Sequence, residues 1–376
     1  MKFIHLSDLH IGKRVNEFSM LEDQRYILSQ IYGIIDSIQP DGVIVAGDVY
    51  DKTTPSEDAV QLLNEFVCTL AEKQVNTYII SGNHDSARRL AFASRLIGKS
   101  GIHISPAYNG QPVKHTLTDS HGPVNIYMLP FIKPAHVRRF YPDADIAGYT
   151  DAVQVAVDNM GVDTSERNII ITHQFVTGAE RSESEELSVG GTDNVDVSVF
   201  DCFDYVALGH IHGPQKMGRD TVRYCGTPLK YSFSEAGHTK SVTIVEMGEK
   251  GDVKITAQPL VPLRDMRIVK GTYNEITHRA NYEKTNTDDY IQVILTDEDD
   301  IPDAISRLRV IYPNIMQLKY DNMRTRTHRE TGGATDVESK SPLQLFSEFF
   351  ESQNNRPMSD RQQRFVRQLI EKIWED

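Results

Sequence analysis

The sequence predicts an α/β protein: a two-sheet sandwich flanked by helices, followed by a small α+β unit and C-terminal helices. Short apolar runs alternate with helical patterns through the first half of the chain, which is typical of sheets covered by helices. Polar residues follow several of these runs, and a smaller, separate pattern of strands and helices begins near Met266. A length of 376 residues exceeds the usual single core, so two or three domains are expected.

The first elements alternate between strand and helix. After the strand Phe3–Leu6, apolar residues at three- and four-residue spacings predict a helix over residues 17–39. A strand at 43–47 follows, a second helix begins near Pro55, and a third strand covers 77–80. Parallel crossovers of this kind place helices on the faces of a sheet.

A second sheet is predicted from the elements that follow. A helix is expected over residues 87–96, and a hairpin excursion over residues 103–125. Next come a strand at 126–129, a helix at 150–160 and a strand at 168–172. Strands at 221–225, 241–247 and 253–257 are expected to complete the second sheet.

The last part of the chain predicts separate units. A strand at 290–295, a helix at 302–312 and a strand at 315–320 form a small α+β unit. The polar stretch that follows contains Gly332–Gly333 and is expected to be a flexible linker. The expected divisions are 1–265, 266–320, the linker 321–340 and a helical segment at 341–376.

The helical segment has two helix-start patterns. Ser341-Pro342 and the pair Ser359 and Gln362 fit capping positions, and an apolar stripe follows each. Two short amphipathic helices after a linker cannot bury these stripes completely against each other. They either fold back onto the rest of the chain or dock into a groove on a partner.

Polar side chains follow five apolar strands. The clusters are Asp8 with His10, Asp48, Asn83 with His84 and Asp85, His173, and His210 with His212. In an open α/β sheet the carboxyl ends of neighbouring strands form one crevice, so all five clusters should face the same small volume. The acidic segment 177–195 lies between two of these strands, and is expected to be a loop over this volume or else disordered.

These residue types indicate a metal centre. Two carboxylates, an amide oxygen and four imidazoles form a mixed oxygen and nitrogen set that suits manganese, iron, zinc or magnesium. Asp8 and His10 are two residues apart, as are His210 and His212, so in an extended segment each pair leaves on one face. The set is too large for one tetrahedral site. It fits two ions with Asp48 as the bridge, an arrangement that clamps the attacking and leaving oxygens of a phosphoryl displacement.

The motifs resemble those of the calcineurin-like metallophosphoesterase superfamily, and more closely those of the SbcD nuclease family. The resemblance is carried by the five clusters in this order and by segments Phe3–Lys13, Ala46–Asp51, Ser188–Gly191 and Tyr224–Glu235. It covers essentially the whole chain, most specifically the first 245 or so residues.

The resemblance implies a role for each cluster. Asp8, His10, Asp48 and His212 would hold one ion, and Asp48, Asn83, His173 and His210 the other. Manganese is expected first, with magnesium or iron as alternatives. His84 is the expected general acid, with Asp85 orienting it, and Asp51 is placed near this shell without an assigned role.

The resemblance also implies a function and partners. The chain would be the nuclease subunit of an SbcC–SbcD-type complex in DNA repair and recombination, acting on duplex ends as an exonuclease and on single strands or hairpins as an endonuclease. Residues 266–320 would cap the DNA, and residues 341–376 would bind the coiled-coil SbcC-type ATPase. A homodimer is expected through helices near 60–75 and 87–97.

The alternative function is that of a stand-alone metallophosphatase or phosphodiesterase on a non-DNA substrate. A catalytically dead scaffold is disfavoured by the complete ligand set.

Composition and charge limit these expectations. A net charge of −13 argues against a simple basic DNA-binding surface. Asp8 and Asp48 bring a charge of roughly −2 to the site against about +4 from two dications, so the site itself stays cationic.

No window approaches the ~18–20 apolar residues of a membrane span, and no leader precedes the first strand. Three separated cysteines suit a reduced, cytoplasmic setting.

Overall fold

A computed structural model describes residues 1–185, 193–322, 342–354 and 357–374. The chain divides into two compact units. The first comprises Met1–Ile294 and Pro302–Lys319, and the second comprises Leu295–Ile301 and Tyr320–Asp376. None of the helices within the described ranges is both long and apolar enough to cross a bilayer.

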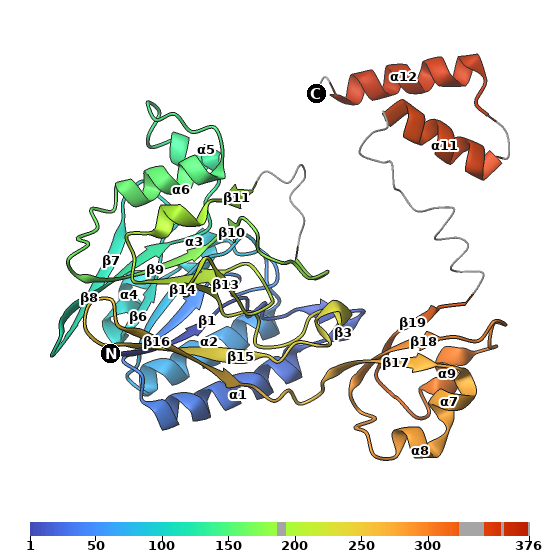
Figure 1. The fold of residues 1–376 in the computed structure, drawn as a ribbon, viewed down its shortest axis with the longest axis horizontal. Coiled ribbons are helices and arrows are strands. Elements are labelled where there is room, and N and C mark those ends of the chain that lie inside the picture. Colours follow the sequence, from blue (N-terminus) through green and yellow to red (C-terminus); the bar gives the residue numbers. More distant parts are fainter. Residues whose placement is uncertain (186–192, 323–341, 355–356, 375–376) are drawn as a thin grey trace. The chain divides into compact units, whose positions relative to one another are not determined.

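The first of two six-stranded sheets contains the N-terminal strand (Figure 1). Its strands lie in the order β16 (Val253–Pro259), β15 (Ser241–Met247), β1 (Lys2–Leu6), β4 (Gly42–Ala46), β5 (Asn76–Ile80) and β6 (Ile102–Ile104). Strands β1, β4 and β5 are parallel, as predicted for the crossovers, and β6, which was not predicted, continues this parallel set. Strand β15 pairs antiparallel with β1, and β16 antiparallel with β15.

The second sheet faces the first. Its strands lie in the order β13 (Gln215–Met217), β14 (Arg219–Tyr224), β12 (Tyr205–Gly209), β9 (Arg167–His173), β8 (Gly122–Leu129) and β7 (Val113–Asp119). Placing residues 241–247 and 253–257 in this sheet was wrong, because β15 pairs with β1. In β15, Val245 and Met247 pack into the core between the two sheets, while Val242 packs into the core on the other face of the first sheet. An apolar run of this kind suits either sheet.

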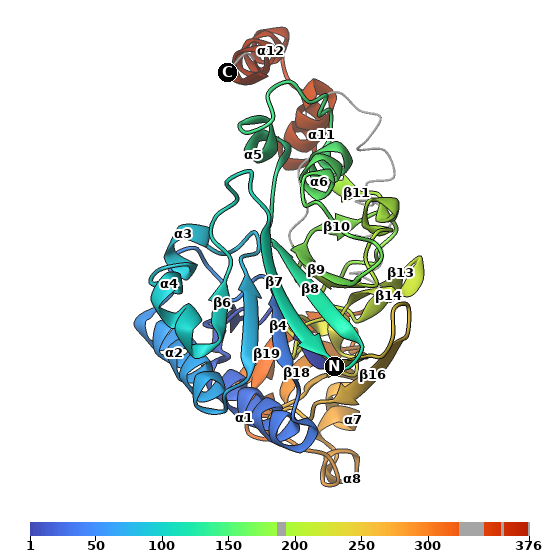
Figure 2. The ribbon, with the colours of Figure 1, turned by 90° about the vertical axis from the view of Figure 1, so that its left-hand side faces the viewer.

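Helices cover the outer face of each sheet. Helices α1 (Leu21–Ile38) and α2 (Glu57–Glu72) share a core with β1, β4 and β5, and lie on the side turned away from β8 and β9 (Figure 2). Helices α5 (Pro134–Arg138) and α6 (Tyr149–Asp158) share another core with β9 and β12. The α/β sandwich flanked by helices is therefore confirmed.

Three predicted helices are shorter than expected. A hairpin of β2 (Arg14–Val15) and β3 (Phe18–Ser19) replaces the start of the helix predicted at 17–39. The helix predicted at 87–96 is divided into α3 (Ala87–Leu90) and α4 (Ser94–Ile97), because Ala93 adopts a φ of 57°. The helix predicted at 302–312 is α9 (Ala304–Leu308).

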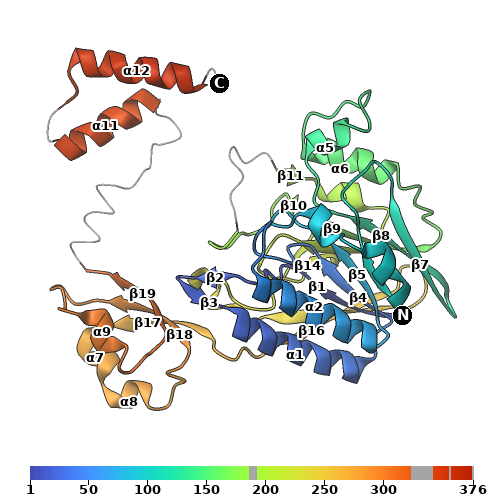
Figure 3. The same cartoon turned by 180° about the vertical axis from the view of Figure 1, so that it is seen from behind.

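The α+β region packs on the hairpin and on α1. It contains β17 (Met266–Gly271), α7 (Tyr273–Thr277), α8 (Arg279–Tyr282), β18 (Tyr290–Leu295) and β19 (Ile315–Tyr320) as well as α9. Gln317 of β19 donates a 3.0 Å hydrogen bond to Asn16 in the hairpin. Figure 3 shows this hairpin beside the sheet of β17, β18 and β19. The Tyr290 hydroxyl donates to Asp23 of α1 at 2.7 Å, and Arg264 pairs with the same carboxylate at 2.9 Å.

The second unit contains the C-terminal helices α11 (Pro342–Asn354) and α12 (Asp360–Trp374). The cap predicted at Ser359 is present: its amide donates to the Gln362 side chain at 2.9 Å, and the Gln362 amide donates back to its hydroxyl at 3.4 Å. The cap predicted at Ser341 and most of the predicted linker lie outside the described residues.

Candidate metal centre

The loops after β1, β4 and β5 of one sheet meet the loops after β9 and β12 of the other. Three groups of side chains there could each hold a metal ion, with ligand atoms within 4.8 Å of one another. The groups are Asp8, His10 and His212; His10, Asp48 and His84; and Asp8, Asp48 and His173. All five predicted strand ends do converge, although from two facing sheets rather than from one open sheet.

Left-handed backbone turns aim these ligands. Asp8, His10, Asp48 and His210 have φ values of 52°, 43°, 46° and 107°. Such values are uncommon for residues other than glycine and often occur at functional sites. The extended segments expected for Asp8 with His10 and for His210 with His212 are therefore interrupted, and the side chains converge through these turns instead.

Two glycines permit the loops to approach closely. A Cβ atom at Gly82 would overlap the Asp48 carboxylate, and one at Gly209 would overlap the Ala46 carbonyl oxygen. Gly82 precedes Asn83, and Gly209 precedes His210. Any side chain at either glycine would therefore push a predicted ligand away from the centre.

The first part of the centre joins His10 and His212. Their Nε2 atoms lie 3.1 Å apart. Two nitrogen ligands about 2.1 Å from one ion are about 3 Å apart when they subtend a right angle at that ion. The backbone amide of His210 lies 3.1 Å from each oxygen of Asp8 and holds this carboxylate beside the pair.

The second part of the centre surrounds Asn83. Its side-chain oxygen lies 2.9 Å from His173 Nε2 and 3.0 Å from His210 Nδ1. The carbonyl of Ala46 can only accept a hydrogen bond, so the His173 Nδ1 atom, 2.8 Å away, carries the proton. A metal ion would therefore bind at Nε2 and take the place of a proton on that atom, as for many ligating histidines.

Asp48 lies between the two parts. Its Oδ2 atom is 3.8 Å from His10 Nε2, 3.8 Å from His84 Nε2 and 3.4 Å from His173 Nε2. Its Oδ1 atom accepts a 2.9 Å hydrogen bond from the His84 amide, which fixes the orientation of the carboxylate. A single carboxylate oxygen facing imidazoles of both parts fits a bridging ligand.

Burial and neighbouring charges set the protonation of these ligands. Burial lowers the pKa of His10 and lowers that of His210 to about 3, so both rings are neutral and able to ligate. Burial also opposes the charge of His173, but the Asp48 carboxylate outweighs it and raises the pKa of His173 to about 9. The same pairing holds the pKa of Asp48 below its usual range despite its burial.

His84 lies at the edge of the centre and is more exposed than its neighbours. Its Nδ1 atom donates to the Asp51 carbonyl oxygen at 3.1 Å, leaving Nε2 directed toward Asp48. The orienting partner of His84 is thus the Asp51 carbonyl and not Asp85. The Asp85 carboxylate instead accepts hydrogen bonds from three backbone amides, those of Val49, Tyr50 and Gly82, and so joins two of the ligand loops.

Three contacts at the centre could not be read from the sequence. Asp51 forms a 2.8 Å ion pair with Lys13, beside His10. Gln24 of α1 donates a 2.8 Å hydrogen bond to the His10 carbonyl. The third contact joins Ser184 Oγ and His212 Nδ1, which lie 2.6 Å apart. Glutamine on a helix and serine in an acidic loop have no distinctive spacing, so only the folded chain shows these partners.

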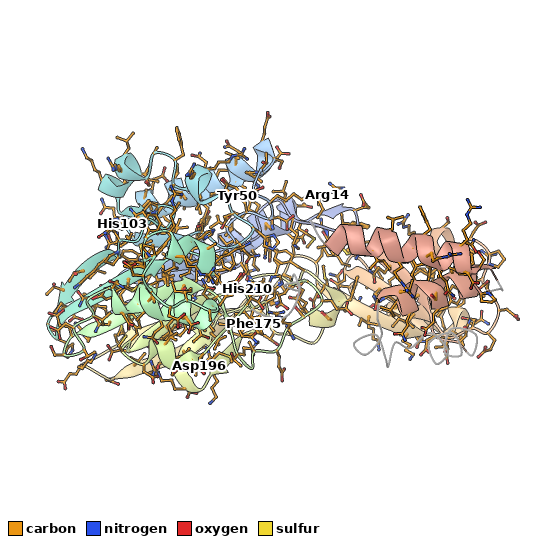
Figure 4. The ribbon with its side chains drawn as sticks, turned by 90° about the horizontal axis from the view of Figure 1, so that it is seen from above. Arg14, Tyr50, His103, Phe175, Asp196 and His210 are labelled. Atoms are coloured by element: carbon orange, nitrogen blue, oxygen red, sulfur yellow. The ribbon has the colours of Figure 1, made fainter. Side chains whose placement is uncertain are left out.

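Phe175 lies beside His210 at the rim of the centre (Figure 4). The two ring centres are 6.3 Å apart, in an edge-to-face arrangement. The guanidinium of Arg181 lies 3.7 Å from the Phe175 ring centre and pairs with Asp193 at 3.1 Å. The segment 177–195 therefore reaches the site through its described part, while residues 186–192, including Ser188–Gly191, lie outside the described residues.

Comparisons with known proteins agree with this geometry. Residues 1–214 match the family model of calcineurin-like phosphoesterases. Residues 262–354 match the family model of the SbcD C-terminal domain, described as the type 5 capsule protein repressor C-terminal domain. One solved crystal structure covers 68% of this chain and 98% of its own length, at 11% identity and a TM-score of 0.37. A similarity at that level carries no argument about function.

The first match spans more than half of the chain, so the chain belongs to the calcineurin-like phosphoesterase family. The proteins of this class are metal-dependent phosphoesterases, which fits the clustered aspartates and histidines. The second match shows which type of phosphoesterase this is. The two domains, in this order, are those of an SbcD-type nuclease subunit.

Proposed function

We propose that this chain is a two-metal DNA nuclease that hydrolyses phosphodiester bonds with manganese. The observation that carries the proposal is the position of Asp48 Oδ2, which faces histidines from both parts of the centre. Mixed carboxylate, amide and imidazole ligands without a thiolate suit manganese, and also admit magnesium or iron. When bound, such a pair of ions would polarise a phosphodiester and activate a water molecule as the nucleophile at neutral pH.

The chain's own residues divide into two ligand sets. Asp8, His10 and His212 would hold one ion together with Asp48. Asn83, His173 and His210 would hold the other, again with Asp48 as the shared carboxylate. Because histidine and asparagine ligate without negative charge, the centre stays cationic and attracts a phosphodiester within an acidic protein.

His84 protonates the leaving alkoxide. Its Nδ1–H is fixed on the Asp51 carbonyl, so Nε2 is the atom that takes up and delivers the proton. The ring is more exposed than the ligand histidines, as expected for a group that reaches substrate. Asp85 supports this geometry indirectly, by holding together the loops that carry Asp48 and Asn83.

DNA is the substrate favoured by the domain organisation. We assign residues 1–265 to the nuclease domain, 266–320 to a DNA-capping domain and 321–340 to a linker. The capping region is fixed to the hairpin that follows the ligand His10, through Asn16 and Gln317. A stand-alone phosphatase would need no such region, whereas a nuclease can use it to hold a duplex beside the ions.

Two protein partners complete the proposal. A homodimer is supported by Phe92 and Leu96, whose side chains are 83% and 73% exposed on the segment containing α3 and α4. The C-terminal segment 341–376 is proposed to bind an SbcC-type coiled-coil ATPase. Such a complex would act in the cytoplasm on duplex ends and on single-stranded or hairpin DNA, in repair and recombination.

The test is cleavage of end-labelled DNA by the purified chain with manganese, with and without the ATPase partner. We expect cleavage of single-stranded DNA by the chain alone, and ATP-stimulated degradation of duplex ends by the complex. A small aryl phosphate monoester serves as the competing substrate. Rapid hydrolysis of the monoester with no cleavage of any DNA would overturn the nuclease proposal and favour the phosphatase.

A further inference from the structure

The side of the His212 ring opposite His10 faces a serine in the loop after β10 (Phe175–Val176). His212 Nδ1 lies 2.6 Å from Ser184 Oγ, and Ser184 Oγ lies 2.6 Å from Glu235 Oε1. Glu235 is fully buried, and its second oxygen pairs with Lys240 at 2.5 Å. A continuous chain of hydrogen bonds therefore connects a buried ion pair to His212.

The direction of these hydrogen bonds follows from the charges. Glu235 Oε2 pairs with the Lys240 ammonium at 2.5 Å, which is the geometry of an ionised carboxylate. An ionised carboxylate only accepts, so the Ser184 hydroxyl must donate to it. Ser184 then accepts from the Nδ1–H of His212. This fixes the His212 tautomer and leaves Nε2 unprotonated on the side of His10.

The backbone of His212 is held by the same group of residues. The Glu185 carboxylate accepts a 2.6 Å hydrogen bond from the His212 amide. Lys240 donates to the His212 carbonyl at 2.9 Å and to the Thr227 hydroxyl at 2.7 Å. His212 is thus fixed at its ring, its amide and its carbonyl, and two of the residues that fix it belong to one loop.

We propose that Ser184 is a positioning residue that sets the tautomer and ring orientation of His212 for metal binding, with Glu235 and Lys240 holding Ser184 in place. The inference rests on the proposed ligand set. It adds a loop residue to the metal centre, beyond the side chains that coordinate directly. Partners of this type commonly change metal affinity by about 10–100-fold when they are removed.

The experiment measures manganese binding to the full chain by titration calorimetry. For the Ser184→Ala variant we expect about 10–100-fold weaker binding of one ion, with the second ion bound as in the wild type. Ser184→Thr, which keeps the hydroxyl, should retain wild-type affinity. Ser184 is partly exposed, so neither change should affect folding, and the thermal midpoint checks this.

A matched control separates ring positioning from ordering of the loop. Ser234→Ala removes the hydroxyl that accepts a 3.0 Å hydrogen bond from the amide of Glu183, a residue of the same loop as Ser184, and this bond does not involve His212. This variant should bind both ions as the wild type does. Unchanged binding by Ser184→Ala, an equal loss in Ser234→Ala, or failure of threonine to restore affinity would each overturn the inference. Fewer than two ions on the wild-type chain would instead overturn the ligand set and the inference with it.

Discussion

The Nε2 atoms of His10 and His212 lie 3.1 Å apart, although the two residues are 202 positions apart in the sequence. His10 follows the first strand of one sheet, and His212 follows a central strand of the other. The centre is therefore complete only when the two sheets have packed together. Ions that bind this folded arrangement and not the unfolded chain must stabilise the sandwich.

Asp48 is the residue whose removal should affect both ions. In Asp48→Ala, we expect loss of both bound ions and of all cleavage, since the same carboxylate faces His10 and His173. Metal content after dialysis, measured by mass spectrometry, checks this. The control is Asp220→Ala, which removes an exposed carboxylate paired with Lys216. Two ions retained per Asp48→Ala chain would contradict the bridging role.

His84 should separate metal binding from chemistry. His84→Ala is expected to keep both ions while cleavage slows by roughly 10²–10⁴-fold, the usual contribution of a positioned acid. His210→Ala is the comparison, because this buried ring contacts Asn83 and should lose metal as well as activity. Metal content that falls together with activity in His84→Ala would make His84 a ligand instead of the acid.

The convergence of the candidate ligands was easier to predict from the sequence than the contacts around them. Ligand residues at strand ends are recognisable because apolar runs mark the strands and the carboxyl ends of strands form sites. The partners of Asp85 and His212 are not recognisable, because the loops that supply them are brought together only in the folded chain. Assignment of β15 to a sheet failed for a related reason: a strand with two apolar faces does not specify its neighbour.

The buried His5 should make stability depend on pH. His5 lies 2.9 Å from the Tyr205 hydroxyl, and burial lowers its pKa from 6.5 to about 3. The unfolded chain gains a proton on this residue below pH 6.5, whereas the folded chain does not until about pH 3. Stability linked to His5 is therefore fully present above pH 6.5 and is lost as pH falls toward 3, by up to about 1.4 kcal/mol per pH unit.

His5→Asn tests this dependence, because asparagine keeps a polar partner for Tyr205 but does not titrate. Urea unfolding at several pH values between 7 and 5 should show a shallower loss of unfolding free energy in the variant than in the wild type. His121→Asn, in an exposed turn, should keep the wild-type slope. Equal slopes in His5→Asn and the wild type would show that His5 does not carry the effect.

The proposed dimer should depend on the exposed apolar residues after Asp85. In Phe92→Glu, we expect light scattering at micromolar concentration to show a monomer, because a charge would be buried at the contact. Lys216→Glu changes an exposed charged residue outside the proposed contact and is the control. A dimeric Phe92→Glu chain, or a wild-type monomer fully active on duplex ends, would count against this interface.

The C-terminal helices should bind the ATPase partner through their apolar side. Phe346, Phe350, Met358, Phe365 and Val366 line a hollow of about 410 Å³ between α11 and α12. Phe349 and Phe365 remain 61% and 63% exposed. Aromatic residues left exposed on short amphipathic helices are typical of a segment that packs into a partner's groove.

Phe365→Glu should therefore abolish co-purification with the ATPase, together with ATP-stimulated degradation of duplex DNA. Metal binding and cleavage of single-stranded DNA should be unchanged, because the candidate ligand groups lie in the first unit. Gln363→Glu places the same charge on an exposed, polar position of α12 and should leave the complex intact. A chain that ends at residue 336 should behave like Phe365→Glu. If that truncated chain still forms a stable complex with the ATPase, or if it no longer folds, the helices have another role.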